Sequence, residues 1–176
     1  KNMIKCGIIG AGAWGSAIST LIRCEQILIW SRNNKTVNSI NSKKTNNYLK
    51  GVRLPKNLIA TNSLQDLKSC DYFFIATPTQ FTRKILKTLA KYNIKKNFII
   101  CNKGMEINTC KFLSTVVRDI FSKANIAVLS GPCFAIEVAN RLPTAVLLAS
   151  KEKNFFNKIT KLIGNKYFRL YYSKDL

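Results

Sequence analysis

Six residues near the start of the chain, Gly10-Ala11-Gly12-Ala13-Trp14-Gly15, follow a short apolar run and match the pattern GxGxxG. In such a loop the first glycine permits a tight turn out of a strand, the second lets the backbone approach a pyrophosphate, and the third lets the next helix pack closely on the sheet. The start of that helix offers unpaired N–H groups and a positive dipole end to phosphate oxygens. The loop therefore predicts a dinucleotide-binding turn, and a purely structural glycine turn is the alternative.

The end of the second predicted strand indicates which dinucleotide would fit. An Asp or Glu at this place would hold the ribose 2′-hydroxyl of NAD, whereas an Arg nearby accepts the 2′-phosphate of NADP. The sequence reads Ile29-Trp30-Ser31-Arg32 and has no carboxylate there. Arg32 therefore favours NADP over NAD, with an ordinary surface arginine as the alternative.

A lysine follows another predicted strand. Lys103 comes two residues after the end of the apolar run at 98–101, and open α/β sheets bind their ligands at the carboxyl ends of strands. An ammonium group at that place could polarise a ketone oxygen as a hydride arrives. The alternative is one more surface lysine among the 22 in the chain.

The elements that must position these residues alternate between β-branched runs and amphipathic segments. Such alternation implies βαβ crossovers, so the expected fold class is α/β, a Rossmann-like, doubly wound, mostly parallel sheet with helices on both faces. Strands are expected at 4–9, 27–30, 58–61, 72–76, 97–101, 126–129, 145–149 and 167–171. Helices are expected at 15–23, 33–44, 63–69, 110–121 and 155–163, in a short segment through Glu137 and Val138, and in one whose apolar face carries Phe81, Ile85, Leu86 and Leu89.

Composition narrows the possible functions. The chain has 176 residues and is 47% hydrophobic, which fits one globular domain, and no stretch is long and apolar enough to span a bilayer. It contains no histidine, which removes histidine general bases, triads and most zinc sites, so no metal site is expected. Six cysteines without CxxC spacing, and no secretion signal, predict a reduced cytoplasmic protein.

The formal net charge of +21 raises nucleic acid as a possible partner. Most of the positive residues are lysines spread singly along the chain, which is typical of a solvated surface. A basic nucleic-acid-binding protein is therefore kept only as an alternative, and no nucleic-acid partner is expected. The charge should still attract phosphorylated small molecules.

Five blocks of sequence, taken in order, resemble the bacterial NAD(P)-dependent glycerol-3-phosphate dehydrogenases. They are the glycine loop with Trp14, the strand end at 28–32 (LIWSR), 47–55 (NYLKGVRLP), 103–106 (KGME) and 130–139 (SGPCFAIEVA), which Pro143-Thr144-Ala145 closes. The pair KGxE and SGPxFAxE is far more specific than the glycine loop. The resemblance implies reversible reduction of dihydroxyacetone phosphate to sn-glycerol 3-phosphate by NAD(P)H, which would feed phospholipid synthesis.

Carried over residue by residue, the resemblance implies roles for ten positions. The residues that would contact the dinucleotide are Gly10, Gly12, Ala13, Trp14, Gly15, Arg32, Lys103 and Ala135. The residues that would contact the substrate are Lys103, Gly131 and Cys133, and Lys103 would also take part in catalysis. Three positions depart from the family pattern: Ala13 stands where Ser is usual, Cys133 where Ser or Thr is usual, and Asn102 where Ser or Thr is usual.

The resemblance also bears on domain organisation. In the family, a point corresponding to Leu176 leads into a helical C-terminal substrate domain, which carries a second lysine and an Arg–Asn pair that grips the substrate phosphate. Residues 1–176 are therefore expected to form one dinucleotide-binding domain of a fragment or truncated product, completed by a homodimer or by a separate C-terminal chain. The alternatives are a dinucleotide-binding module without catalysis and another dehydrogenase of the same class.

Overall fold

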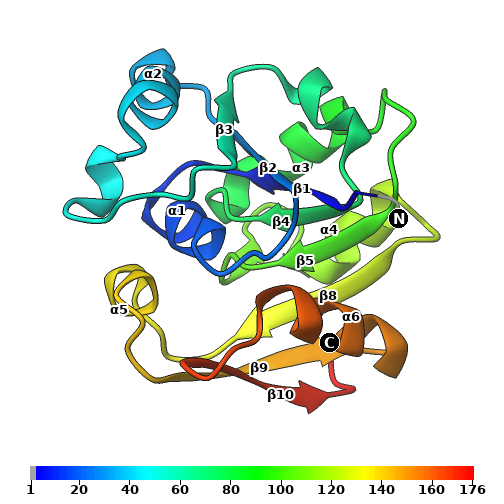
Figure 1. The fold of residues 1–176 in the computed structure, drawn as a ribbon. Coiled ribbons are helices and arrows are strands. Elements are labelled where there is room, and N and C mark those ends of the chain that lie inside the picture. The colour runs from blue at the N-terminus through cyan, green and yellow to red at the C-terminus, as the bar shows by residue number, and fades with distance from the viewer. Residues whose placement is uncertain (1–2) are drawn as a thin grey trace.

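The computed structural model describes residues 3–176 and contains an eight-stranded sheet in the order β10-β9-β8-β5-β4-β1-β2-β3 (Figure 1). From β1 the chain adds β2 and β3 on one side, then crosses over to add β4, β5 and β8 on the other. The order reverses between β1 and β4, and such a switch point opens a crevice at the carboxyl ends of the strands. The strands are β1 Lys5–Ile9, β2 Gln26–Trp30, β3 Leu58–Thr61, β4 Tyr72–Ile75, β5 Asn97–Ile100, β8 Asn125–Ser130, β9 Thr144–Ser150 and β10 Phe168–Ser173.

Helices cover both faces of this sheet. One buried apolar cluster joins α1, α2, α5 and α6 to the sheet, and a second joins α3 and α4 to the opposite face. The helices are α1 Ala13–Ser19, α2 Asn34–Lys43, α3 Thr79–Leu89, α4 Leu113–Ile120, α5 Ala135–Ala139 and α6 Lys153–Ile163, with short 3₁₀ turns at Asn47–Leu49 and Leu64–Ser69. The Rossmann-like, doubly wound fold class is therefore confirmed.

The end of the sheet departs from the parallel pattern. β9 pairs with β8 in antiparallel fashion, and β10 is parallel to β9. A parallel strand would require a crossover along the whole length of β8, about 20 Å for six residues. The connection contains only α5, whose five residues rise about 7.5 Å. The chain therefore turns back at the edge where β8 ends.

A two-stranded hairpin stands where the sequence predicted the start of a helix. β6 Met105–Glu106 pairs with β7 Lys111–Phe112, and α4 begins only at Leu113. Cys110 has a φ of 50°, in the left-handed region, so a right-handed helix cannot start there. The predicted helix at 110–121 was thus wrong at its first three residues.

Helix α3 carries its apolar residues as predicted, with one exception. Ile85, Leu86 and Leu89 are buried against the sheet, but Phe81 is 46% exposed. Phe81 lies one turn earlier, where α3 projects beyond the carboxyl ends of the strands, so its ring faces the crevice. Within residues 3–176 no helix has the length and apolar character needed to cross a membrane.

Candidate functional site

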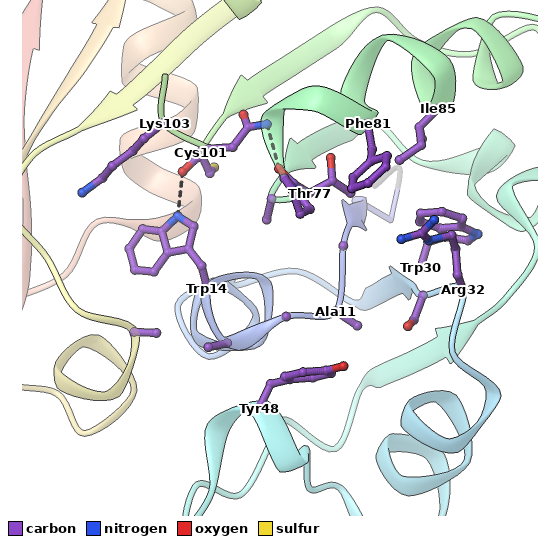
Figure 2. Close-up of a pocket in the computed structure, with 18 of the residues that line it drawn as sticks. Ala11, Trp14, Trp30, Arg32, Tyr48, Thr77, Phe81, Ile85, Cys101 and Lys103 are labelled. Carbon is purple, nitrogen blue, oxygen red and sulfur yellow. Dashed lines mark hydrogen bonds between the residues drawn. The ribbon is translucent and has the colours of Figure 1, made fainter. Parts of the chain in front are cut away.

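A pocket of about 1010 Å³ lies at the carboxyl ends of β1, β2, β4 and β5, at the switch point (Figure 2). Its volume is at the upper end of the usual range for ligand sites, about 300–1,000 Å³, so it has room for a ligand as long as a dinucleotide. The lining combines the glycine loop, the end of β2, the β4–α3 connection, the end of β5 and the start of α5. The lining residues are Gly10–Trp14, Trp30–Asn33, Tyr48, Ala76–Pro78, Phe81, Ile85, Cys101–Lys103 and Cys133–Ala135.

The three glycines of the loop differ in what surrounds them. Gly10 has a φ of 115°, and a Cβ there would lie 2.8 Å from the backbone carbonyl of Ala76. A Cβ on Gly15 would lie 1.9 Å from the carbonyl oxygen of Gly10, so no side chain fits between α1 and the loop. A Cβ on Gly12 would meet no atom within 4 Å, because this position opens into the pocket. These surroundings indicate that Gly10 forms the turn, that Gly15 allows α1 to pack against the loop, and that Gly12 leaves space for a ligand.

A buried asparagine that the sequence analysis missed holds the loop in place. Asn46 donates from Nδ2 to the carbonyl of Ala11 (2.9 Å) and to Oγ of Ser16 (2.8 Å). Its Oδ1 accepts the backbone N–H of Tyr48 (3.1 Å), whose ring lies below the glycine loop in Figure 2. Asn46 lies in a loop next to a second asparagine, so no signal in the sequence set it apart.

One end of the pocket groups Arg32 with aromatic side chains (Figure 2). The Arg32 guanidinium carbon lies 5.0 Å from the centre of the Phe81 ring, a cation–π contact that keeps the cation at the pocket. Trp30 donates from Nε1 to the carbonyl of Asn62 (3.1 Å). No carboxylate lines the pocket among the described residues, so nothing there repels a ligand phosphate.

The other end brings Lys103 and Trp14 together (Figure 2). Trp14 donates from Nε1 to the carbonyl of Cys101 (2.8 Å), which joins the start of α1 to the end of β5. Lys103 donates from Nζ to the carbonyl of Gly131 (3.2 Å), and the Cys133 thiol lies 3.6 Å from the same oxygen. Burial raises the pKa of the Cys133 thiol, although the Lys103 ammonium partly opposes this, so the thiol stays neutral.

Eight of the ten predicted site residues therefore line one pocket. Gly10, Gly12, Ala13, Trp14, Arg32, Lys103, Cys133 and Ala135 are among its lining residues. Gly15 and Gly131 lie behind the lining, where Gly15 packs on Gly10 and Gly131 accepts from Lys103. In residues 3–176 no group of three or more acidic, histidine or cysteine side chains is arranged to hold a metal ion. A glycine loop between an arginine and a lysine suits an elongated anion with phosphates near its middle.

Comparison with known proteins agrees with this geometry. Residues 5–156 match the family model described as the N-terminus of NAD-dependent glycerol-3-phosphate dehydrogenase. A glycerol-3-phosphate dehydrogenase [NAD(P)+] of Erythrobacter litoralis is 36% identical over 172 residues, which cover 96% of this chain and 52% of that protein. A protein of the same name from Hyphomonas neptunium is 38% identical over 174 residues, which cover 97% of this chain and 52% of that protein.

Solved structures point to the same family. A crystal structure of glycerol-3-phosphate dehydrogenase from Coxiella burnetii superposes with a TM-score of 0.91 at 26% identity and covers 99% of this chain and 55% of that one. The chain spans about half the length of the curated relatives it matches. The matched family model, the relatives and the pocket together show that this chain belongs to the family of NAD-dependent glycerol-3-phosphate dehydrogenase N-terminal domains.

Proposed function

We propose that this chain is the cofactor-binding part of an enzyme that reversibly reduces dihydroxyacetone phosphate to sn-glycerol 3-phosphate with NADPH or NADH. The observation that carries the proposal is one pocket in which Lys103, beside the Gly131 carbonyl and the Cys133 thiol, lies across from Arg32 with the glycine loop between them. The names of the relatives supply the reaction.

The fit of a nicotinamide dinucleotide is supported by the space at Gly12 and by the absence of carboxylates from the described lining. When bound, the nicotinamide supplies or accepts the hydride. The backbone at Gly12 and Ala13 would hold the pyrophosphate, Arg32 a 2′-phosphate, and Trp14 and Ala135 further parts of the dinucleotide. Gly10 and Gly15 would shape the loop.

Lys103 would act on the substrate. Its ammonium would donate a hydrogen bond to the ketone oxygen and stabilise the negative charge that develops there during reduction. Gly131 and Cys133 would contact the substrate next to it, and the neutral thiol is a weaker hydrogen-bond donor than the hydroxyl common in the family. These roles rest on the position of Lys103 at the end of β5 and on its contact with the carbonyl of Gly131.

The remaining parts of the site would come from a further domain or a separate chain, or from a homodimer. A second lysine and a phosphate-gripping Arg–Asn pair, which the resemblance implies, have no counterpart assigned among these residues. The six cysteines are free, which supports a place in the reducing cytoplasm. The product, sn-glycerol 3-phosphate, would be used in phospholipid synthesis.

The test compares turnover with and without the additional part. Residues 1–176 alone should bind NADPH but show no measurable reduction of dihydroxyacetone phosphate, because no phosphate-gripping pair is assigned among them, nor a second lysine as the general acid, which adds roughly 10²–10⁴-fold. Supplying the missing domain, in cis or as a separate chain, should restore turnover. Lys103→Ala should then abolish it, whereas Lys123→Ala, at an exposed lysine in a turn after α4, should not. Ordinary turnover by residues 1–176 alone would contradict the proposal.

A further inference from the structure

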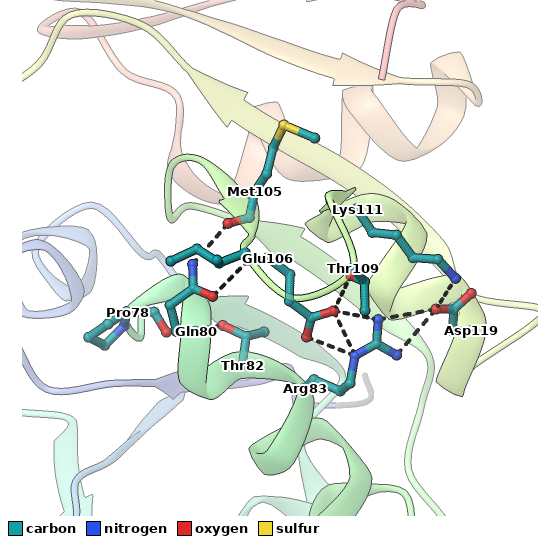
Figure 3. Close-up of polar contacts among 10 residues, drawn as sticks. Pro78, Gln80, Thr82, Arg83, Met105, Glu106, Thr109, Lys111 and Asp119 are labelled. Carbon is teal, nitrogen blue, oxygen red and sulfur yellow. Dashed lines mark hydrogen bonds and ion pairs between the residues drawn. The ribbon is translucent and has the colours of Figure 1, made fainter.

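Side chains from the first turns of α3 contact the stretch that begins at Met105, two residues after Lys103 (Figure 3). Thr79 donates from Oγ1 to the carbonyl of Lys103 (2.6 Å). Gln80 donates from Nε2 to the carbonyl of Met105 (2.9 Å), and its Oε1 accepts the backbone N–H of Ile107 (2.9 Å). Two adjacent side chains of one helix therefore fix the backbone at Lys103, Met105 and Ile107.

One turn further along α3, Arg83 forms a two-pronged ion pair with Glu106 of β6. Nε donates to Oε1 (2.8 Å) and Nη2 to Oε2 (2.8 Å), a geometry that fixes orientation as well as distance. The Glu106 side chain is only 9% exposed, and the Arg83 guanidinium lowers the pKa of its carboxyl to about 2. Thr109 also donates to Glu106, and Asp119 of α4 accepts from Arg83 (3.2 Å) and Lys111 (2.9 Å).

The hairpin that these contacts hold has little apolar packing of its own. Ile107 is 72% exposed and Phe112 is 60% exposed, whereas the buried side chain is that of Glu106. Gly104 has a φ of 93°, and a Cβ there would meet no atom within 4 Å. A two-stranded hairpin with strands this short is not stable by itself in water. Its position, and with it the position of Lys103, therefore depends on polar contacts with α3.

We propose that Thr79, Gln80, Arg83 and Glu106, here called the α3 clamp, are positioning residues that keep the Lys103 ammonium in the pocket. The inference deepens the proposed function and rests on it. Helix α3 starts directly after the pocket-lining residues Thr77 and Pro78, so the same helix sets one wall of the pocket and the place of the lysine. A merely structural clamp would change folding stability but not the contact between Lys103 and a bound dinucleotide.

The experiment measures acylation of Lys103 by an amine-reactive reagent, with and without saturating NADPH, by peptide mass spectrometry. The other lysines of the same sample serve as internal references. In the wild type, NADPH should protect Lys103. In Thr79→Val, the acylation rate of Lys103 in the NADPH-saturated chain should rise by about 3- to 10-fold, which corresponds to one lost hydrogen bond. In Arg83→Met, which removes the two-pronged ion pair with Glu106, the acylation rate should rise at least as much.

Two controls separate positioning from folding. Thr79→Ser keeps the hydroxyl and should restore protection, and Thr88→Val removes a hydroxyl that bonds only within α3, so it should leave protection unchanged. NADPH binding can be followed in the same samples by the fluorescence of Trp14 and Trp30, the only tryptophans of the chain, which both line the pocket. If Arg83→Met does not fold, Thr79→Val still decides the question.

The outcomes are distinct. Protection in the wild type that is equally strong in Thr79→Val and Arg83→Met would overturn the clamp and leave the proposed function in place. Absence of protection in a wild type that binds NADPH would also overturn the clamp, because Lys103 would then not be held against the dinucleotide, whereas the proposed function is decided separately by the turnover test. Loss of protection in the two variants, with rescue by Thr79→Ser, would establish the clamp.

Discussion

Gly12 and Gly15 belong to one motif but have different roles, which can be told apart by the atoms that surround each of them. A Cβ at Gly12 would meet no protein atom within 4 Å, whereas a Cβ at Gly15 would lie 1.9 Å from the carbonyl oxygen of Gly10. A side chain at position 12 would thus take space from a ligand. A side chain at position 15 would instead force α1 away from the sheet.

Gly12→Val should therefore abolish NADPH binding while shifting the melting temperature little. Gly15→Ala, the matched control, should lower the free energy of unfolding by about 2 kcal/mol or more, because overpacking at a backbone contact cannot be relieved by a rotamer change. Titration calorimetry and thermal melting of both variants check this. Normal NADPH affinity in Gly12→Val would mean that the loop is only a turn.

Arg32 should determine the preference between the two cofactors. It lies at the aromatic end of the pocket, held over the Phe81 ring. Its contact with a 2′-phosphate should be worth about 1.5–3 kcal/mol, so Arg32→Ala should weaken NADPH binding by roughly 10- to 150-fold and leave NADH binding nearly unchanged. Arg118→Ala is the control, because Arg118 lies outside the pocket. Equal affinity of the wild type for NADPH and NADH would contradict the NADP preference.

At the scale of elements, Asn46 links a loop to the site. It is buried, and its Nδ2 donates to the carbonyl of Ala11 and to Ser16. Asn46→Ala should lower the free energy of unfolding by about 1–3 kcal/mol, because it leaves buried polar groups unpaired, and should weaken NADPH binding through the displaced glycine loop. Asn47→Ala, the next residue along, is the matched control. Chemical denaturation and NADPH titration of both variants measure the difference.

The hairpin should respond to acid through Glu106. Because Arg83 donates to its carboxylate, the pKa of Glu106 is lowered from 4.5 to about 2. A carboxyl whose folded-state pKa is depressed stabilises the fold above its ordinary pKa, and this stabilisation is lost as the pH falls from about 4.5 to about 2. Glu106→Gln should therefore cost about 1–2 kcal/mol near neutral pH, and its difference from the wild type should shrink steadily as the pH falls from about 4.5 to about 2 and disappear below that.

Denaturation by urea at a series of pH values checks this prediction. Glu152→Gln is the matched control, since Glu152 is exposed at the start of α6 and belongs to none of the ion pairs of the described residues. A difference between Glu106→Gln and the wild type that persists unchanged at pH 2 would rule out the ion pair as its source.

Local patterns predicted most elements, because the central strands β1, β2, β4 and β5 are apolar runs that are buried on both faces after their first residue. Ile8 and Ile9, for example, are fully buried in different clusters on opposite sides of the sheet. The hairpin at 105–112 escaped prediction because polar contacts from α3, rather than an apolar pattern, hold it. Helical periodicity puts Phe81 on the same face as Ile85 and Leu89, but it does not show that the first turn of α3 extends past the strand ends, where Phe81 lines the pocket. The GxGxxG spacing and the resemblance identified the pocket, but the partners of Lys103 on α3 emerged only from the fold.

At the scale of the whole molecule, the charge of +21 opposes folding. Four ion pairs are formed among the described residues, and the many remaining lysines repel one another across the surface. Salt screens such repulsion over about 10 Å at 0.1 M ionic strength. The melting temperature should therefore rise as sodium chloride is raised from a few millimolar to about 0.15 M. The melting temperature of a protein with balanced charges would change little over the same range of salt concentration.

Charge-reversal variants test whether repulsion between surface lysines lowers the melting temperature. Lys91→Glu combined with Lys123→Glu changes two exposed lysines that are not part of the pocket lining and lowers the net charge. The double variant should melt higher than the wild type at low salt, and its melting temperature should rise less when salt is added, because less repulsion remains to be screened. Calorimetric melting of both proteins across the same salt series gives the comparison. A wild-type melting temperature that falls with added salt would show that the ion pairs, including Arg83–Glu106, outweigh the repulsion, and the surface charge would then not be what limits stability.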